Sequence, residues 1–243
     1  MPEIEQTIGR WFTRIETGLK AYGPAKTALD QVIGASISVI ENYLTSACLL
    51  VTEKRVLPTK ALLRPVGEFT AKLRWCIAGG TKEEIYERIQ QWRKDSWRAY
   101  ERYWKAVRNA CNGSDCAHID ERIRGASRQL AEMNDFSRLP TTKKILDSVF
   151  SQDLPVRVGI YTQYLYATHV DIVTLAQTVA EDGGYTECVG DLVGGESSLE
   201  LDLLSLAYLY AETISKHYGW DYAEMLSEYK ILTNSEDGKP TEQ

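Results

Sequence analysis

The sequence predicts an all-α protein, an irregular bundle of about eight helices. Apolar residues recur about every 3.6 residues along most of the chain, as they do on one face of a helix. Gly and Pro residues interrupt this period and mark the ends of the segments. No two segments alternate apolar and polar residues in the way that paired strands do. We therefore expect a strand content close to zero.

The first half of the chain divides into four helices. Trp11 and Ile15 lie at helical spacing in the first, which a Gly-Pro pair ends. The second has a broad apolar face, and Pro58 begins the third, which a Gly-Gly pair ends. Thr81 and Glu84 have the spacing of a capping box and start the fourth. These helices are expected over residues 2–21, 24–53, 58–78 and 81–111.

The second half contains shorter helices and one long connection. Pro140 and Pro155 each precede a helical segment, and residues 185–198 are rich in Gly, Ser and acidic residues. Helices are expected over 116–134, 142–150, 155–182, 199–218 and 221–232. We divide the chain into a main helical bundle (1–184), a flexible connector (185–198), a C-terminal helical extension (199–232) and a disordered polar tail (233–243).

Composition and charge narrow the function classes. A chain of 243 residues with 44% apolar residues can bury a sizeable core. The net charge of −6 argues against a globally basic nucleic-acid-binding protein, although a local basic patch is compatible with it. Polar residues interrupt every apolar run before the roughly 20 residues of a membrane span, and the N-terminus lacks the pattern of a signal peptide. We expect a cytoplasmic protein with no membrane segment.

Two charged residues, Arg64 and Glu68, lie among the apolar residues of the third helix. At about 100° per residue their side chains fall on the face opposite the main apolar stripe. Trp75 shares their face and argues against full exposure, so we expect this helix to be central in the bundle. A charged pair in such a place is either a structural ion pair or part of a binding or catalytic site. The sequence leaves both interpretations open.

The expected helix over 155–182 carries a second group of polar residues. Tyr161 and Tyr164 lie on its apolar stripe, and His169 lies on the shoulder of that stripe. A histidine in this position is either a hydrogen-bonded core residue or a general acid/base. We predict that Arg64 and Glu68 face this helix, with the two tyrosines as binding residues.

The fourth helix is both aromatic and basic. We expect Tyr103 on its core face. Arg98 and Lys105 belong, with Lys94 and Arg108, to an arc of cations on the solvent side beside Trp97 and Trp104. Cations next to aromatic rings suit the phosphates and bases of RNA. The alternative is a solvated face whose long side chains cover the rings, and Glu101 in the same arc favours it. RNA is therefore a weakly supported partner.

The sequence shows no cofactor motif. It lacks a phosphate-binding Gly loop, a G-x-S-x-G elbow and a His-Glu-x-x-His zinc motif. Cys111 and Cys116, with His118 nearby, are compatible with a metal site, but no second ligand pair follows, and reduced thiols are the alternative. We expect neither a cofactor nor a metal.

Two segments carry a family resemblance: residues 62–68 (LLRPVGE) and 161–169 (YTQYLYATH), separated by the helix rich in Trp and Tyr. This layout resembles an uncharacterised bacterial all-helical family with an R-x-x-x-E … Y … S/T-H pattern, which is distantly similar to HEPN-type helical bundles. The resemblance covers about residues 25–181. Many HEPN bundles are RNA-cutting toxins or defence components, so the resemblance implies a role in bacterial stress or phage defence.

The chain departs from HEPN nucleases in one respect. Those enzymes carry an arginine a few residues before a histidine, and no Arg–His pair here has that spacing. We therefore expect a helical binding or interaction module that pairs with a second copy or with another protein. The alternative is a metal-independent ribonuclease, in which Arg64 is the phosphate clamp, Glu68 the orienting carboxylate and His169 the general acid/base.

Overall fold

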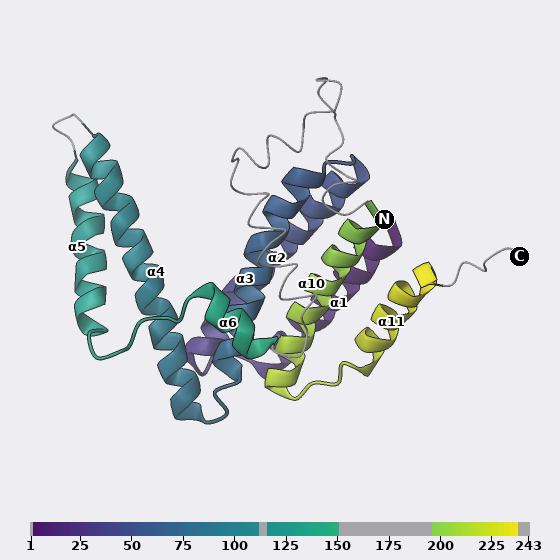
Figure 1. The fold of residues 1–243 in the computed structure, drawn as a ribbon. Coiled ribbons are helices and arrows are strands. Elements are labelled where there is room, and N and C mark those ends of the chain that lie inside the picture. The colour runs from purple at the N-terminus through teal and green to yellow at the C-terminus, as the bar shows by residue number, and fades with distance from the viewer. Residues whose placement is uncertain (1, 112–115, 151–195, 238–243) are drawn as a thin grey trace, which may run out of the picture.

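The computed structural model describes residues 2–111, 116–150 and 196–237, and within these it contains eight helices and no strand (Figure 1). This confirms the predicted all-α bundle. The expected helix over 155–182 and the expected connector lie outside the described residues. The helices are α1 (Pro2–Tyr22), α2 (Ala28–Thr52), α3 (Val56–Ile77), α4 (Lys82–Ala110), α5 (Ala117–Glu132), α6 (Thr142–Val149), α10 (Glu196–Tyr218) and α11 (Ala223–Asp237).

Capping boxes fix the starts of the two longest helices. The Thr81 hydroxyl accepts the N–H of Glu84 at the start of α4, and the Glu84 carboxylate accepts the N–H of Thr81 in return. Thr27 and Asp30 make the same reciprocal pair at α2. This second box places the first residue of α2 at Ala28, four residues after the expected start.

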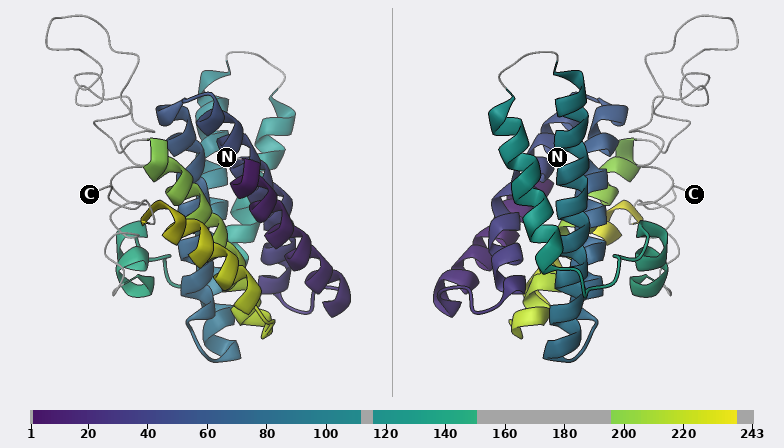
Figure 2. Two further views of the ribbon diagram at one scale, coloured as in Figure 1. Left: turned by 90° about the vertical axis from the view of Figure 1, so that its right-hand side faces the viewer. Right: turned by 90° about the vertical axis from the view of Figure 1, so that its left-hand side faces the viewer.

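The core is built around α3 and α10. Helix α3 contacts α2, α4, α6 and α10, and α10 contacts α1, α2, α3 and α11 (Figures 1 and 2). The most deeply buried side chains of α10 point at these neighbours: Leu203, Leu204, Ala207, Tyr210, Ala211 and Ile214. Burial on several sides makes α3 central, as its sequence predicts. Helix α10, which was expected to belong to a C-terminal extension, is thus packed in the same core as α1–α3.

Helix α2 is long and apolar enough, by length and composition, to cross a membrane, and it is the one such helix among the described residues. Its side chains Ile33, Ile37 and Leu44 are buried in the protein core. A core helix meets the same length and composition criterion as a membrane span.

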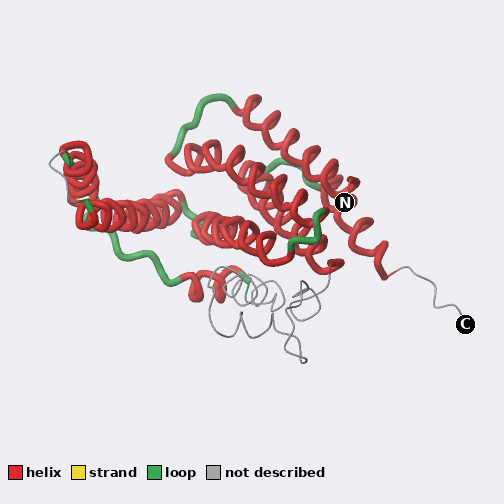
Figure 3. Tube along the Cα trace, turned by 90° about the horizontal axis from the view of Figure 1, so that it is seen from above, coloured by secondary structure: helices red, strands yellow, loops and turns green. Residues whose placement is uncertain are grey.

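Helix α4 leaves the body of the protein halfway along its length. Its first half packs through Ile89 and Trp92 against α2 and α3, and its second half pairs with α5 (Figure 3). We call α5 with residues 97–110 of α4 the arm, and the remaining helices with the first half of α4 the body. Tyr103, expected on the core face of α4, is 60% exposed, because the body no longer covers the helix at that point.

A buried carboxylate joins α2 to the end of α10. Asp30 is 5% exposed, and its Oδ2 accepts the backbone N–H groups of Lys26 and Thr27 at 2.9 and 2.8 Å. The Tyr218 hydroxyl donates to Oδ1 at 2.7 Å. Burial by itself raises the pKa of Asp30, but the hydrogen bonds from Tyr218, Lys26 and Thr27 outweigh it and hold the pKa below the usual 3.8.

Helix α11 is joined to α1, the first helix of the chain, by polar contacts. Glu228 accepts a hydrogen bond from Trp11 Nε1 at 2.7 Å and pairs with Arg10 at 3.1 Å. Just before α11, the Trp220 ring lies against Gly18 of α1, where an added Cβ would lie 2.8 Å from ring carbons. Glycine at residue 18 is therefore required by the close approach of the indole.

We predict that Gly18→Ala destabilises the protein by about 1–3 kcal/mol, because the methyl group collides with the Trp220 ring. The matched control is Gly9→Ala in the same helix, where a Cβ meets nothing within 4 Å. It should stabilise the protein by about 0.5–1 kcal/mol, because alanine is the better helix former. Urea denaturation of both variants measures the difference, and equal effects of the two substitutions would contradict the packing of Trp220 on α1.

We predict that Asp30→Asn costs about 1–3 kcal/mol at neutral pH, because hydrogen bonds to a charged carboxylate are lost. The folded-state pKa of Asp30 is lowered, so its contribution is present above the unfolded value of 3.8. It is lost as the pH falls through the lower folded value. The stability difference between wild type and variant should therefore shrink in urea denaturation near pH 2–3. Asp135→Asn, at an exposed aspartate, should show no such dependence. A pH-independent difference would contradict this role of Asp30.

Candidate binding surface

The predicted pair on α3 is formed. Arg64 Nε donates to Glu68 Oε1 at 2.7 Å, and the two side chains are 25% and 29% exposed. The pair is thus half-buried, neither sealed in the core nor fully solvated. Tyr161, Tyr164 and His169 lie outside the described residues. Their approach to Arg64 and Glu68 stays a prediction.

A buried lysine precedes this pair, and the sequence analysis missed it. Lys60 lies one turn before Arg64, and neither it nor Thr59 has any exposed surface. Burial lowers the pKa of Lys60, and the nearby Asp202 carboxylate of α10 opposes that shift. The signal in the sequence was the i, i+4, i+8 spacing of Lys60, Arg64 and Glu68. That spacing puts all three on one row of α3.

The basic arc of α4 is largely occupied by contacts within the protein. Lys105 Nζ pairs with Glu101 at 3.0 Å, and Arg108 Nε donates to Asp120 of α5 at 3.0 Å. Lys94 is 5% exposed and donates to the backbone carbonyls of residues 134 and 136, beyond the end of α5. Lys94 therefore does not belong to a solvent-facing row. Arg98 is half-buried on the arm.

A groove of about 490 Å³ lies between α2, α3 and α4, and we call it the body groove. Its walls are mostly apolar, and Val39 on its α2 side is 51% exposed. Trp92 and Trp97 form the α4 side. The lining consists of Val32, Ala35, Ser36, Val39, Ile40, Phe69, Ile89, Trp92, Arg93, Ser96 and Trp97.

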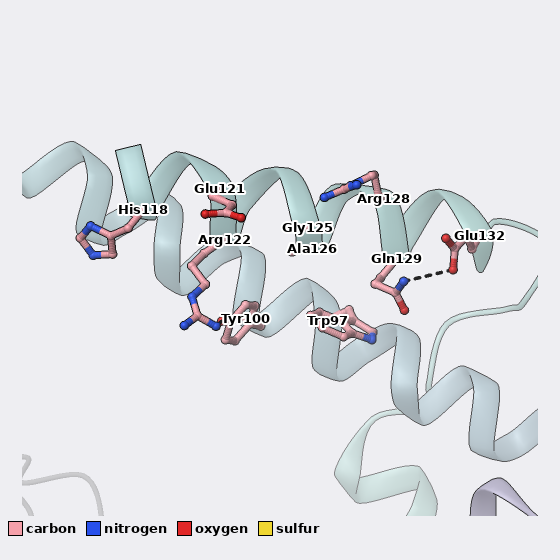
Figure 4. Close-up of a pocket in the computed structure, with 10 residues that line it drawn as sticks. All are labelled: Trp97, Tyr100, His118, Glu121, Arg122, Gly125, Ala126, Arg128, Gln129 and Glu132. Atoms are coloured by element: carbon pink, nitrogen blue, oxygen red, sulfur yellow. Dashed lines mark hydrogen bonds between the residues drawn. The ribbon is translucent and has the colours of Figure 1, made fainter. Parts of the chain in front are cut away.

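A second groove of about 670 Å³ runs along the arm, between α4 and α5, and we call it the arm groove (Figure 4). Trp97 and Tyr100 come from α4, and Arg122 of α5 lies over Tyr100, with Nη1 donating to the hydroxyl at 3.4 Å. Small residues of α5 open the groove opposite Trp97. The α5 lining consists of His118, Glu121, Arg122, Gly125, Ala126, Arg128, Gln129 and Glu132.

The two grooves adjoin, because Trp97 lines both of them. Together they form one surface that extends from α2 across the start of the arm to α5. Arg64 and Glu68 line neither groove. Within the described ranges, no group of three or more His, Cys, Asp or Glu side chains could hold a metal ion. The body groove offers mainly apolar contacts, and the arm groove adds charged groups of both signs.

Comparison of the chain with protein-family models, with curated proteins and with solved structures finds no match.

We predict that Glu68→Ala costs only about 0.5–1 kcal/mol, because water screens an ion pair that is partly exposed. Lys105→Ala, which breaks an i, i+4 pair on the arm, should cost no more than this. Thermal or urea denaturation of both variants tests the prediction. A loss above about 3 kcal/mol for Glu68→Ala would mean that Arg64 is left as a buried, uncompensated charge.

Proposed function

We propose that the protein is a helical interaction module, and that the body groove with the adjoining arm groove binds one amphipathic helix of a partner protein. The observation that carries the proposal is the apolar lining of the body groove, which the described helices leave uncovered and which adjoins the more polar arm groove at Trp97. Exposed apolar patches bounded by polar residues mark sites of protein interaction.

The shape of the body groove favours a helical occupant. Val32, Ala35 and Val39 lie on α2 at spacings of three and four residues, so they form one ridge along the groove. Trp92 and Trp97 form the facing wall on α4. A helix whose apolar residues recur at i, i+3, i+4 and i+7 fits between two such ridges. No described segment offers a sheet edge for a strand.

The charges around the grooves indicate the polar face of the partner. Arg93 lies in the body groove, and it is exposed. Arg122 and Arg128 lie in the arm groove, together with Glu121 and Glu132. The body groove is thus bordered by one cationic side chain, whereas the arm groove carries both positively and negatively charged side chains. We infer that the bound helix carries acidic residues where it passes Arg93, which would set its direction.

The alternative of a ribonuclease receives less support from the described residues. Arg64 is held by Glu68 at 2.7 Å, and Lys94, Lys105 and Arg108 are engaged within the protein. Few cations of the basic arc remain for phosphates. The proposed general acid/base, His169, lies outside the described residues. A role in stress or defence and a homodimeric state both stay proposals.

We predict that Val39→Glu weakens partner binding roughly 30-fold, because a carboxylate is forced into an apolar contact. The binding partner for the measurement is a helical peptide selected from a displayed library against the wild-type protein. The affinity is read by fluorescence anisotropy. Leu49→Glu is the matched control, because Leu49 lies on the same helix, is 61% exposed and does not line either groove. It should leave the affinity unchanged.

Three results would contradict the proposal. Selected peptides that bind Val39→Glu and wild type equally would place the binding surface elsewhere. A dimer in analytical ultracentrifugation that Val39→Glu dissociates would make a second copy of the chain the occupant. Salt-dependent binding of single-stranded RNA that Arg98→Ala with Lys105→Ala abolishes, and Val39→Glu preserves, would make the basic arc the functional surface.

A further inference from the structure

Two cysteines meet at the tip of the arm. Cys111 follows the last residue of α4 and Cys116 is the N-cap residue of α5. Cys116 Sγ donates to Cys111 Sγ at 2.7 Å. The sequence places the two cysteines five residues apart but does not say that they touch. The two helix ends bring the sulfur atoms together.

We propose that Cys111 and Cys116 form a redox modification site, a dithiol that is converted to a disulfide by a low-molecular-weight disulfide. The inference is independent of the proposed partner helix. It rests on the contact between the sulfur atoms and on the fixed positions of the helix ends that carry them.

An ion pair holds the two helix ends in register. Arg108 Nε, three residues before Cys111, donates to Asp120 Oδ1, four residues after Cys116, at 3.0 Å. Each residue of the pair lies about one turn from a cysteine. A disulfide needs two closely approaching and correctly directed cysteines, and the paired helices supply that arrangement before oxidation.

The other described cysteines lack these features and serve as internal controls. Cys48 and Cys76 are buried in the core, and burial raises the pKa of each thiol to about 12. A buried thiol with a raised pKa forms little thiolate and reacts slowly. Cys188 lies outside the described residues.

Exposure decides which sulfur reacts first. Cys111 is half-buried, whereas Cys116 is 3% exposed. The hydrogen bond to Cys111, followed by burial, raises the pKa of Cys116, so its thiol tends to stay protonated. Cys111 is therefore the attacking residue and Cys116 the resolving residue.

Oxidised glutathione is the oxidant, and it takes two electrons from the two protein thiols in two exchange steps. The Cys111 thiolate attacks one glutathione sulfur, the glutathione S–S bond breaks, and one glutathione leaves as thiolate. The Cys116 thiol loses its proton to solvent and attacks Cys111 Sγ, which releases the second glutathione. Two protein thiols are oxidised and one glutathione disulfide is reduced to two thiols.

The experiment equilibrates the full-length protein with oxidised and reduced glutathione and reads intact mass and non-reducing peptide maps. Wild type and Cys188→Ser should both lose about 2 Da, the mass of two hydrogens, with the bond mapped between Cys111 and Cys116. Cys116→Ser should stop at a glutathione adduct on Cys111. Cys111→Ser should form no adduct at Cys116 under the same conditions.

The same measurement on unfolded protein shows whether the fold favours the disulfide or whether the nearness of the two cysteines in the sequence is sufficient. The equilibrium constant for forming the Cys111–Cys116 bond should be at least about tenfold higher in the folded protein than in urea, because the arm holds the sulfurs together. An equal or lower constant in the folded protein would overturn the proposal. So would a folded protein whose mass and peptide map show no Cys111–Cys116 bond at any glutathione ratio.

Discussion

The length of α4 is the constraint from which the rest of the structure follows. Its 29 residues span about 43 Å, and the body helices α2 and α3 cover only its first half. The second half presents Tyr100 and Trp104, which would face water without a partner. Helix α5 packs beside them: the His118 ring lies edge-on to Trp104 with centroids 6.3 Å apart, and Arg122 donates to the Tyr100 hydroxyl. The arm, the arm groove and the contact between the two cysteines all follow from this second pairing.

The buried polar groups of the protein are found where helices end or meet. Asp30 accepts the backbone N–H groups of Lys26 and Thr27 just before α2, and Lys94 donates to carbonyls beyond the end of α5. Such backbone groups have no partner within their own helix. A buried charged side chain satisfies them in both places, Asp30 from α2 itself and Lys94 from the neighbouring helix α4. Lys94 thereby fixes the base of the arm to the chain segment that returns to the body.

The sequence could predict the helices and their order because each element carries its own local signals. The periodicity of α1 and the box at Thr81 and Glu84 placed their helices closely. The start of α2 was missed because the box there uses Asp30 in place of the usual Glu or Gln.

The errors on α4 and the gaps in the candidate site have a different cause. Tyr103 was assigned to the core and Lys94 to the solvent because a helical wheel shows direction but not where a neighbouring helix stops. The pairing of Arg64 with Glu68 was predictable, since residues four apart on a helix are neighbours. The grooves were not, because their walls come from helices whose packing angles no local pattern encodes.

The central position of α10 has a consequence for how the chain is made. This helix contributes Leu203, Tyr210 and Ile214 to the middle of a core whose other walls are α1, α2 and α3. Those walls leave the ribosome long before α10 does. At about 5–20 residues per second, roughly 6–24 seconds separate the end of α3 from the start of α10. During that interval the apolar faces of α1–α3 have no central helix to pack on, and a nascent chain in this state is a natural client for holding chaperones.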